Sequence, residues 1–271
     1  MDDACEHCAA SVDDFFTFYY HQYDEHYILT GLTEEAAKTE TDIILPATYR
    51  GENVEIIYQR AFYENQKINS VTVSEGYTTV KEEAFSKCEN LISVELPDSI
   101  TDMENAIFKG CTSLMYANIP RSIKKIPAST FSYCQSLTNT SVYIHEGITE
   151  IGSNAFYGCK GLTKVIIPDT VKVIRAFAYE ECTNMTEIVV GKRVERIEWH
   201  AFDCGMTLKS IIMRNSKGWM LKAYYTDTGD PVDISIKQQD LDRPFRAALY
   251  FTQNYVKYNW ERGVIVNPPR D

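Results

Sequence analysis

The sequence lacks the features that mark a membrane protein, a nucleic-acid-binding protein or a common enzyme. No apolar run approaches the roughly 20 residues that a membrane-spanning helix needs, so membrane insertion is not expected. Acidic residues outnumber basic ones by 38 to 27, and the net charge of −11 repels nucleic-acid phosphates, which argues against a nucleic-acid partner. The signatures G-x-S-x-G, H-E-x-x-H and G-x-x-x-x-G-K-[ST] are all missing, so the sequence predicts no catalytic residue and no cofactor.

The first fourteen residues, MDDACEHCAASVDD, also lack the basic and apolar regions of a secretory signal. This leaves two interpretations open, a cytosolic protein or a protein whose leader has been replaced. Hydrophobic residues make up 44% of the 271-residue chain and charged residues 24%. That composition is sufficient for one sizeable core or for two compact domains.

What the sequence does contain is an internal repeat. The segments VKEEAFSKCENLISVELP (80–97) and IGSNAFYGCKGLTKVIIP (151–168) share the frame I/V-x-x-x-A-F-x-x-C-x-x-L-x-x-V-x-I/L-P. Successive aromatic positions are 23 residues apart, except for one step of 25 that places two extra residues between Leu137 and Val142. The aromatic residues are Phe62, Phe85, Phe108, Phe131, Phe156, Tyr179 and Phe202.

A 23-residue unit is too small to bury its own apolar side chains, so neighbouring units must stack around a continuous core. The L-x-x-V-x-I segment predicts a short strand whose V and I side chains point inward, because side chains alternate along a strand. The proline that follows ends the strand, since it has no N–H to donate. A later apolar pair, such as Ile148 and Ile151, predicts a second short segment on the opposite wall.

The repeat resembles the hallmark of the BspA-like, or Treponema pallidum-type, leucine-rich-repeat family, most clearly at 84–97 and 155–168. The resemblance covers roughly residues 42 to 215. It implies an α/β repeat solenoid that is curved, with a parallel β-sheet on its concave wall and β-rich caps. It also implies adhesion or protein binding at a bacterial cell surface, or secretion, and it brings no catalytic residues.

Three regions are predicted on this basis: a tail and β-hairpin cap (1–41), a solenoid of about seven repeats (42–215), and an α/β cap or accessory domain (216–271). In the first region, strands at 15–20 and 27–30 flank a polar turn, where His21 and His26 are expected to be exposed.

The last region is expected to begin with a hairpin around TDTGDP, a dense turn signal. A helix should follow, with Asp242 as its N-cap, Pro244 in the first turn and a shared apolar face. A final strand with alternating aromatic and aliphatic side chains should end the region. The shared face comprises Phe245, Ala248, Leu249 and Thr252, and the final strand contains Val256, Tyr258 and Trp260.

Six of the eight cysteines form a ladder at the repeat position three residues after the aromatic, or beside it: Cys88, Cys111, Cys134, Cys159, Cys182 and Cys204. We interpret them as small buried residues, while a metal or redox array and disulfide bridging stay open alternatives. Asn65 occupies the same position and is expected to hydrogen-bond the turn backbone. Cys5 and Cys8 enclose His7 outside the repeats, so metal binding, redox activity and a mobile tail are all open there.

The outward positions of the predicted strands form the candidate binding surface. They are polar in the first half of the solenoid and become apolar from Tyr143 onward. Apolar surface rimmed by charge is typical of protein interfaces, in which aromatic residues are favoured anchors. Two alternatives are that β-branched residues simply favour strands, and that the C-terminal region covers them. The predicted ligand-binding residues are Tyr116, Tyr143, Lys164, Ile166, Glu187, Val189 and Ile212.

The sequence therefore favours a non-enzymatic scaffold that binds a protein or peptide. A purely structural spacer and an enzyme with an unrecognised site in the C-terminal region are the alternatives.

Overall fold

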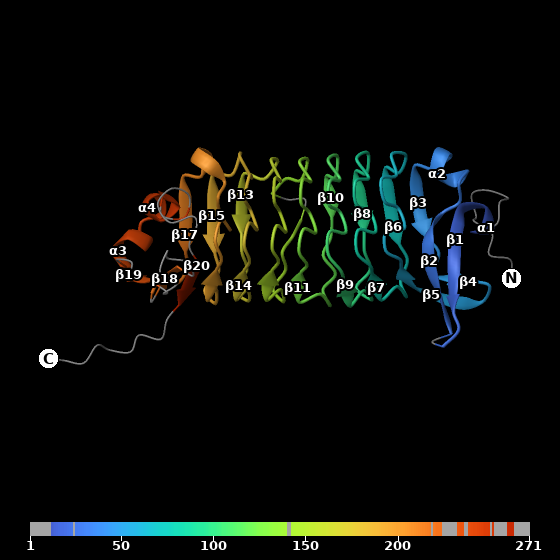
Figure 1. The fold of residues 1–271 in the computed structure, drawn as a ribbon, viewed down its shortest axis with the longest axis horizontal. Helices are drawn as coiled ribbons and strands as arrows, with labels where there is room; N and C mark the ends of the chain where they lie inside the picture. Colours follow the sequence, from blue (N-terminus) through green and yellow to red (C-terminus); the bar gives the residue numbers. More distant parts are fainter. Residues whose placement is uncertain are drawn as a thin grey trace.

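The computed structural model describes residues 12–23, 25–139, 142–217, 219–223, 232–235, 238–249, 251 and 259–262. Figure 1 shows a stack of coils, elongated along one axis, with the N-terminal end and the C-terminal end at opposite ends of the stack. The stack has about eight turns. Each regular coil supplies one strand to a first wall, one strand to a second wall and an aromatic turn that joins the two.

The first wall contains the strands predicted from L-x-x-V-x-I, and they pair in parallel. Val71 lies opposite Val94, and Val165 lies opposite Ile188, all with buried side chains, which confirms the predicted inward positions. The strands are β3 (Asp42–Leu45), β6 (Ser70–Val73), β8 (Ser93–Glu95), β10 (Tyr116–Ala117), β13 (Lys164–Ile166), β15 (Glu187–Val190) and β17 (Ser210–Met213).

The second wall is another row of short parallel strands, which confirms the predicted apolar segment opposite the first wall. Within the described part of 42–215 the only helical segment is the 3₁₀ turn η1 (Gly205–Thr207), so the coils are built of strands and turns. The strands are β5 (Glu52–Ile57), β7 (Thr79–Val80), β9 (Asp102–Met103), β11 (Lys125–Ile126), β12 (Glu150–Ile151), β14 (Val173–Ile174) and β16 (Arg196–Ile197).

The aromatic turns stack into a third surface, which we call the turn wall, made of residues 60–64, 83–87, 106–110, 129–133, 154–158, 177–181 and 200–204. In every turn but the last, three backbone N–H groups donate to carbonyl oxygens in or directly before the next turn along the stack. This ladder continues across the 25-residue step, where the N–H groups of Ser129, Phe131 and Tyr133 donate over 2.6–2.8 Å. The turn wall is therefore continuous along the repeats.

The turn wall depends on backbone in the left-handed region. The residue two places before each aromatic has a φ between 55° and 60°, as in Ser129 and His200, although none of these residues is glycine. The N–H groups of these residues, His200 apart, donate to the next turn. Left-handed backbone costs an ordinary residue about 1–2 kcal/mol, which the stacked hydrogen bonds and the core offset.

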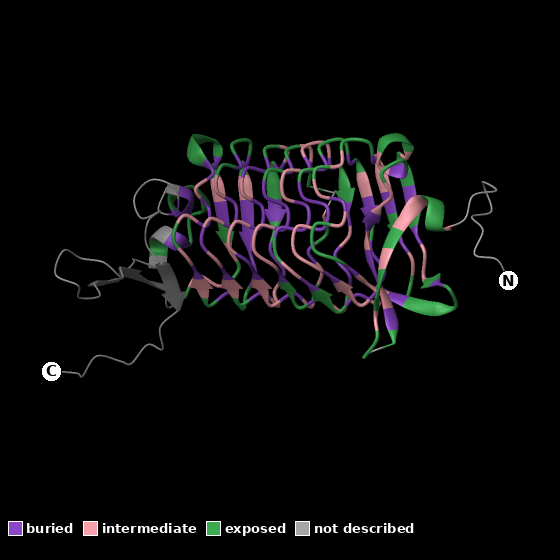
Figure 2. Cartoon of the chain, turned by 45° about the vertical axis from the view of Figure 1, so that its right-hand side comes forward, coloured by how far each residue is buried: buried purple, intermediate pink, exposed green. Residues whose placement is uncertain are grey.

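The interior holds a column of aromatic rings beside the turn wall. Ring centroids of successive copies from Phe62 to Tyr179 lie 4.9–5.6 Å apart and nearly parallel. Figure 2 shows the buried segments inside the stack and the exposed ones along its turns. The last step differs, because the rings of Tyr179 and Phe202 are 6.0 Å apart and inclined by 40°. The ring column thus loosens at the last coil.

The six ladder cysteines are buried and free, as the small-residue interpretation predicts. Each thiol donates to the carbonyl oxygen of the aromatic residue in the preceding coil, over 2.9–3.2 Å. Burial raises the pKa of every one of these thiols, and that of Cys88 to about 12. Metal ligands and nucleophiles are thiolates, so this ladder is suited to structure and unsuited to either chemistry.

Asn65 replaces the first cysteine as predicted. Its side-chain Oδ1 accepts hydrogen bonds from the N–H groups of Lys67 and Ile68, at 2.8 and 3.0 Å. Cys204 lies one residue early in the sequence, yet its thiol reaches Tyr179 O as the other thiols reach their own partners. The one-residue shift in the sequence therefore does not remove the Cys204 thiol from the ladder of thiol hydrogen bonds.

The N-terminal end carries helices α1 (Val12–Phe15) and α2 (Ala36–Thr39) and the antiparallel hairpin β1 (Phe16–His21) and β2 (His26–Leu32). Strand β2 pairs in parallel with β5, so the hairpin extends the second wall, and β4 (Thr48–Tyr49) forms a tight hairpin with β5. The predicted exposure is wrong for His26, which is buried and stacks on the His21 ring. Its strand is enclosed between β1 and β5, which the sequence pattern did not indicate.

At the C-terminal end, β18 (Trp219–Ala223) pairs with β19 (Val232–Ser235) and with β20 (Asn259–Arg262), which adds to the second wall beside β16. The predicted helix forms as α4 (Pro244–Leu249), and a short helix that was not predicted, α3 (Gln238–Leu241), precedes it. Phe245 was expected on the buried face, but it is 63% exposed. Ala248 is buried, as the predicted shared face requires, and Ala247 is buried beside it, whereas Phe245 lies in the exposed first turn of α4.

Several sequence predictions lie outside the described residues, namely those on Cys5, Cys8, Thr252, Val256 and Tyr258. The three domain boundaries stay a prediction. Among the residues that the structure describes, no helix has the length and apolar character to cross a membrane.

Candidate protein-binding surface

The two extra residues of the 25-residue step interrupt the first wall. Pairing along this wall stops at β10 and resumes at β13, which leaves a four-stranded and a three-stranded sheet. The described residues between them, Val142 to Ile144, form no strand. Because the turn wall is unbroken at this step, the insertion disturbs one side of the coil only.

The side chain of Asn139 completes the hydrogen bonding at the edge of the three-stranded sheet of the first wall. In regular coils one backbone carbonyl accepts from two consecutive N–H groups of the next coil, as Thr163 O does for Thr186 and Glu187. Before β13 the side-chain Oδ1 of Asn139 takes this role, accepting from the N–H groups of Thr163 and Lys164 at 2.9 Å each. An amide side chain thus substitutes for a backbone carbonyl.

Tyr143 lies at the interruption and has a side chain that is 74% exposed. It lines two adjoining grooves, of about 280 and 490 Å³. Val142, Ile144 and Ile166 give the first groove an apolar lining, with Lys164, Glu146 and Arg214 also lining it. The second groove is more polar and is lined by Tyr116, Asn118, Arg121, Asp98, Glu75 and His145, among others. A phenol ring between an apolar groove and a charged groove is suited to contact a partner's side chains on both sides.

The apolar row beyond Tyr143 is less exposed than the sequence predicts. Ile166, Val189 and Ile212 lie in register on three adjacent strands, with exposures of 53%, 9% and 37%. Val189 was predicted to contact a ligand, but it is buried because the longer isoleucine side chains flank its short one. Ile166 and Ile212 keep the predicted exposure.

The charged residues predicted in this surface pair with each other. Lys164 Nζ forms an ion pair with Glu187, which lies opposite it on β15. At the end of the row, Arg214 donates to Asp169 Oδ1 over 2.9 Å. This bond, together with the Lys192 N–H and side chain, lowers the pKa of Asp169 to about 2. His145 Nε2 lies 3.1 Å from Pro120 O, which fixes its ring at the rim of the second groove.

The structure therefore brings Tyr116, Tyr143, Lys164 and Ile166 together around two adjoining grooves. Glu187 contributes through its ion pair with Lys164, and Ile212 lies farther along the row. Sequence reasoning missed Asn139, Arg121 and Arg214. The insertion itself was the available signal, because a change of repeat length must be absorbed by an irregular backbone.

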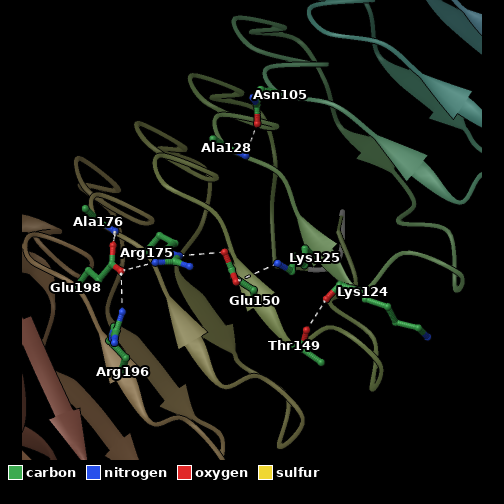
Figure 3. A network of polar contacts seen from close by, with 10 residues as sticks. All are labelled: Asn105, Lys124, Lys125, Ala128, Thr149, Glu150, Arg175, Ala176, Arg196 and Glu198. Atoms are coloured by element: carbon green, nitrogen blue, oxygen red, sulfur yellow. Dashed lines mark hydrogen bonds and ion pairs between the residues drawn. The ribbon is translucent and has the colours of Figure 1, made fainter.

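The second wall carries a network that sequence reasoning also missed (Figure 3). Arg175 bridges Glu150 at 2.9 Å and Glu198 at 2.8 Å, and Lys125 and Arg196 extend the row at 3.6 and 4.0 Å. Beside it the backbone of Gly152 packs closely on the preceding coil, since an added Cβ would lie 2.7 Å from the Ile126 carbonyl oxygen. These charges satisfy each other, so the second wall offers a partner less unpaired surface than the region around Tyr143.

Comparison with known proteins agrees with this architecture. A family model described as "BspA type Leucine rich repeat region" matches residues 41–143 and 114–226, in six copies. A T. pallidum leucine-rich repeat protein (TpLRR) is similar in structure, with a TM-score of 0.64, 26% identity, and coverage of 73% of this chain and 90% of that chain. No curated protein sequence matches the chain.

Two further solved structures show the same fold. A leucine-rich repeat protein from Bacteroides ovatus has a TM-score of 0.64 at 22% identity, over 75% of this chain and 52% of that chain. One from Eubacterium ventriosum has a TM-score of 0.57 at 24% identity, over 72% and 51%. The family model covers well over half of the sequence and matches the coils seen in the structure. The chain therefore belongs to the BspA-type leucine-rich repeat family.

Proposed function

We propose that the chain is a non-enzymatic scaffold that binds a segment of another protein, or a peptide, across Tyr143 on the first wall. The observation that carries the proposal is the exposed Tyr143 ring between two grooves, where pairing of the first wall is interrupted between β10 and β13. Family membership supports a protein-binding role. Adhesion at a bacterial surface is the setting that the family resemblance favours.

The grooves indicate the chemistry of the partner. Val142, Ile144 and Ile166 favour an aliphatic or aromatic side chain in the first groove. Glu75, Asp98 and Arg121 in the second groove favour a polar neighbour with hydrogen-bonding groups. A ligand with one apolar anchor and a polar flank, such as an exposed loop or a short peptide, matches both grooves.

A peptide-display selection tests the proposal. Peptides selected on the immobilised chain are measured against the double variant Tyr143→Ala/Ile166→Ser, which we expect to weaken binding at least about 10-fold, since buried aromatic anchors are worth about 2 kcal/mol or more. Thermal stability should change little, because both side chains are mostly exposed.

Ile44→Ser is the matched control. Ile44 is an outward isoleucine on the first wall, 69% exposed, but it lies on β3 in the first coil. Its replacement should leave peptide binding unchanged. Selected peptides that bind the double variant as tightly as the wild type would contradict the proposal and favour a structural spacer.

A further inference from the structure

The last two turns of the turn wall bring together three metal-ligating side chains. Glu180 follows the aromatic Tyr179, and Asp203 follows the next aromatic, Phe202, in the equivalent position. His200 lies two residues before Phe202 and points between the two carboxylates. The backbone N–H of Glu181 donates to Asp203 O at 3.0 Å, so the backbone holds the two turns in register.

The three ligand atoms have the spacing of a metal site. His200 Nδ1 lies 3.2 Å from Glu180 Oε1 and 3.1 Å from Asp203 Oδ2, and all three atoms lie within 4.8 Å of one another. Zinc binds imidazole nitrogen and carboxylate oxygen at about 2.0–2.2 Å, so neighbouring ligands of a tetrahedral site are about 3.3 Å apart. A small movement of one carboxylate would place all three atoms around one ion.

The negative charges of the cluster also favour the binding of a cation. Two carboxylates occupy the same position in adjacent coils, where like charges repel. Among the described residues, neither Glu180 nor Asp203 forms an ion pair with a lysine or an arginine. A cation bound between the two carboxylates would compensate their charge.

The cluster lies where the ring column and the cysteine spacing depart from the repeat. Here the ring column is tilted, with Tyr179 and Phe202 inclined by 40°, and Cys204 comes one residue early. Earlier coils carry no carboxylate in the position of Glu180, so the two carboxylates are a local departure from the repeat; the residues there are Tyr63, Ser86, Lys109, Ser132 and Tyr157. A cross-link between these two coils would stabilise the packing of the last turn on the rest of the stack.

We propose that Glu180, His200 and Asp203 bind a divalent transition-metal ion of the Zn²⁺ class, with water completing its coordination, and that the ion cross-links the last two coils. One nitrogen and two carboxylate oxygens suit such ions, and three protein ligands leave one position open. The ligands come from two coils, so binding should stabilise the C-terminal end of the solenoid. The site is separate from the surface around Tyr143.

The test is Zn²⁺ titration of the full chain by calorimetry, together with the thermal midpoint with and without Zn²⁺. Cys5→Ser and Cys8→Ser are included in every protein, so that the C-x-x-C pair cannot bind the ion. We expect one ion per chain and a thermal midpoint that rises with free Zn²⁺. His200→Asn, Glu180→Ser and Asp203→Ser should each weaken binding by at least about 10-fold and remove the rise.

These substitutions are chosen to keep the fold. Asn154 occupies the His200 position in an earlier coil, with a φ of 57° against 55°. Serine replaces Glu180 and Asp203 as it does at Ser86 and Ser132. His145→Asn on the first wall is the matched control, and it should leave Zn²⁺ affinity unchanged.

Two results would overturn the proposal. One is the absence of saturable, one-to-one Zn²⁺ binding, in which case the cluster is an imidazolium–carboxylate ion pair. The other is Zn²⁺ binding that His200→Asn and Glu180→Ser leave unchanged, which would place the ion elsewhere. A circular-dichroism spectrum for each variant shows that the coils are intact, so lost binding is assigned to lost ligands.

Discussion

Both polar atoms of the Asn139 side-chain amide form hydrogen bonds with Thr163. Oδ1 accepts from the Thr163 backbone N–H at 2.9 Å, and Nδ2 donates to Thr163 Oγ1 at 2.8 Å. The same Oδ1 also accepts from the Lys164 N–H. These bonds join the irregular coil to the start of β13, at the point where the first wall has no strand pairing.

Asn139→Ala should destabilise the chain by about 1–2 kcal/mol, because three hydrogen bonds with modest net value are lost at a partly solvated site. Asn139→Asp keeps the acceptor for both N–H groups and should cost less. Urea unfolding followed by circular dichroism measures the difference. Asn90→Ala, which removes a single bond to Gln66 O, is the control and should cost less than Asn139→Ala. Equal losses for the two alanine variants would contradict the role given to Asn139.

The cysteine ladder predicts a loss of stability at alkaline pH. A thiol in the unfolded chain has a pKa of about 8.5, whereas burial raises the folded pKa of Cys88 to about 12. Above pH 8.5 the unfolded chain releases protons that the folded chain keeps, so the free energy of unfolding falls as pH rises. Each buried thiol contributes a slope of about 1.4 kcal/mol per pH unit.

Urea midpoints between pH 7.5 and 10, under reducing conditions, measure that slope. Cys134→Ala removes one titrating thiol, so its stability should fall less steeply with pH, although it is less stable than the wild type at neutral pH. A stability that is constant up to pH 10 would show that the thiols titrate normally in the folded chain.

The stacking in the ring column predicts a large loss of stability when one of its rings is removed. Phe131 is fully buried, and its ring stacks on those of Phe108 and Phe156 at 5.6 and 5.4 Å. Phe131→Ala should cost about 3–5 kcal/mol, since it leaves a cavity that the stacked coils cannot close. Chemical denaturation provides the value. The same substitution at the exposed Phe245 should cost less than about 0.5 kcal/mol, and a similar loss at both positions would argue against the stack.

The backbone of the turn wall predicts that a serine-to-glycine substitution changes stability in opposite directions at Ser129 and Ser153. Ser129 has a φ of 57°, so Ser129→Gly should stabilise the chain by about 0.5–1 kcal/mol through relief of left-handed strain. Ser153 has no positive φ, so Ser153→Gly should destabilise it by a similar amount. Thermal midpoints of the two variants provide the comparison. The same sign for both changes would contradict the strain argument.

Much of the fold could be predicted because the repeat imposes it. A 23-residue unit whose valines and isoleucines alternate can bury them only by stacking, and Val94, Val165 and Ile188 are buried as expected. The cysteine ladder followed from the same logic, because a small side chain at a fixed position in every coil has a fixed place in the core. The hairpin at the N-terminal end was also recognisable from alternation around a polar turn.

The candidate site was only partly predictable. Alternation identifies Val189 as outward, but whether it is exposed depends on Ile166 and Ile212 on neighbouring strands. In the same way, helical periodicity placed Phe245 on one apolar face with Ala248, but α4 buries Ala248 and leaves Phe245 63% exposed, so what packs against the helix decides which part of that face is covered. Both errors arise because the burial of a side chain depends on residues from neighbouring strands and coils, which a local sequence pattern does not contain.

The sequence by itself determined the coil length, the inward positions and the place of the insertion near Asn139, because these depend on periodicity alone. The tertiary structure decided that the turn wall absorbs none of the insertion, so that the first wall opens around Tyr143. It also decided that Glu180 and Asp203 face each other across His200, since residues 23 apart meet only when coils stack in register. Periodicity fixes the structure of each coil, and contacts between coils form the candidate binding surfaces.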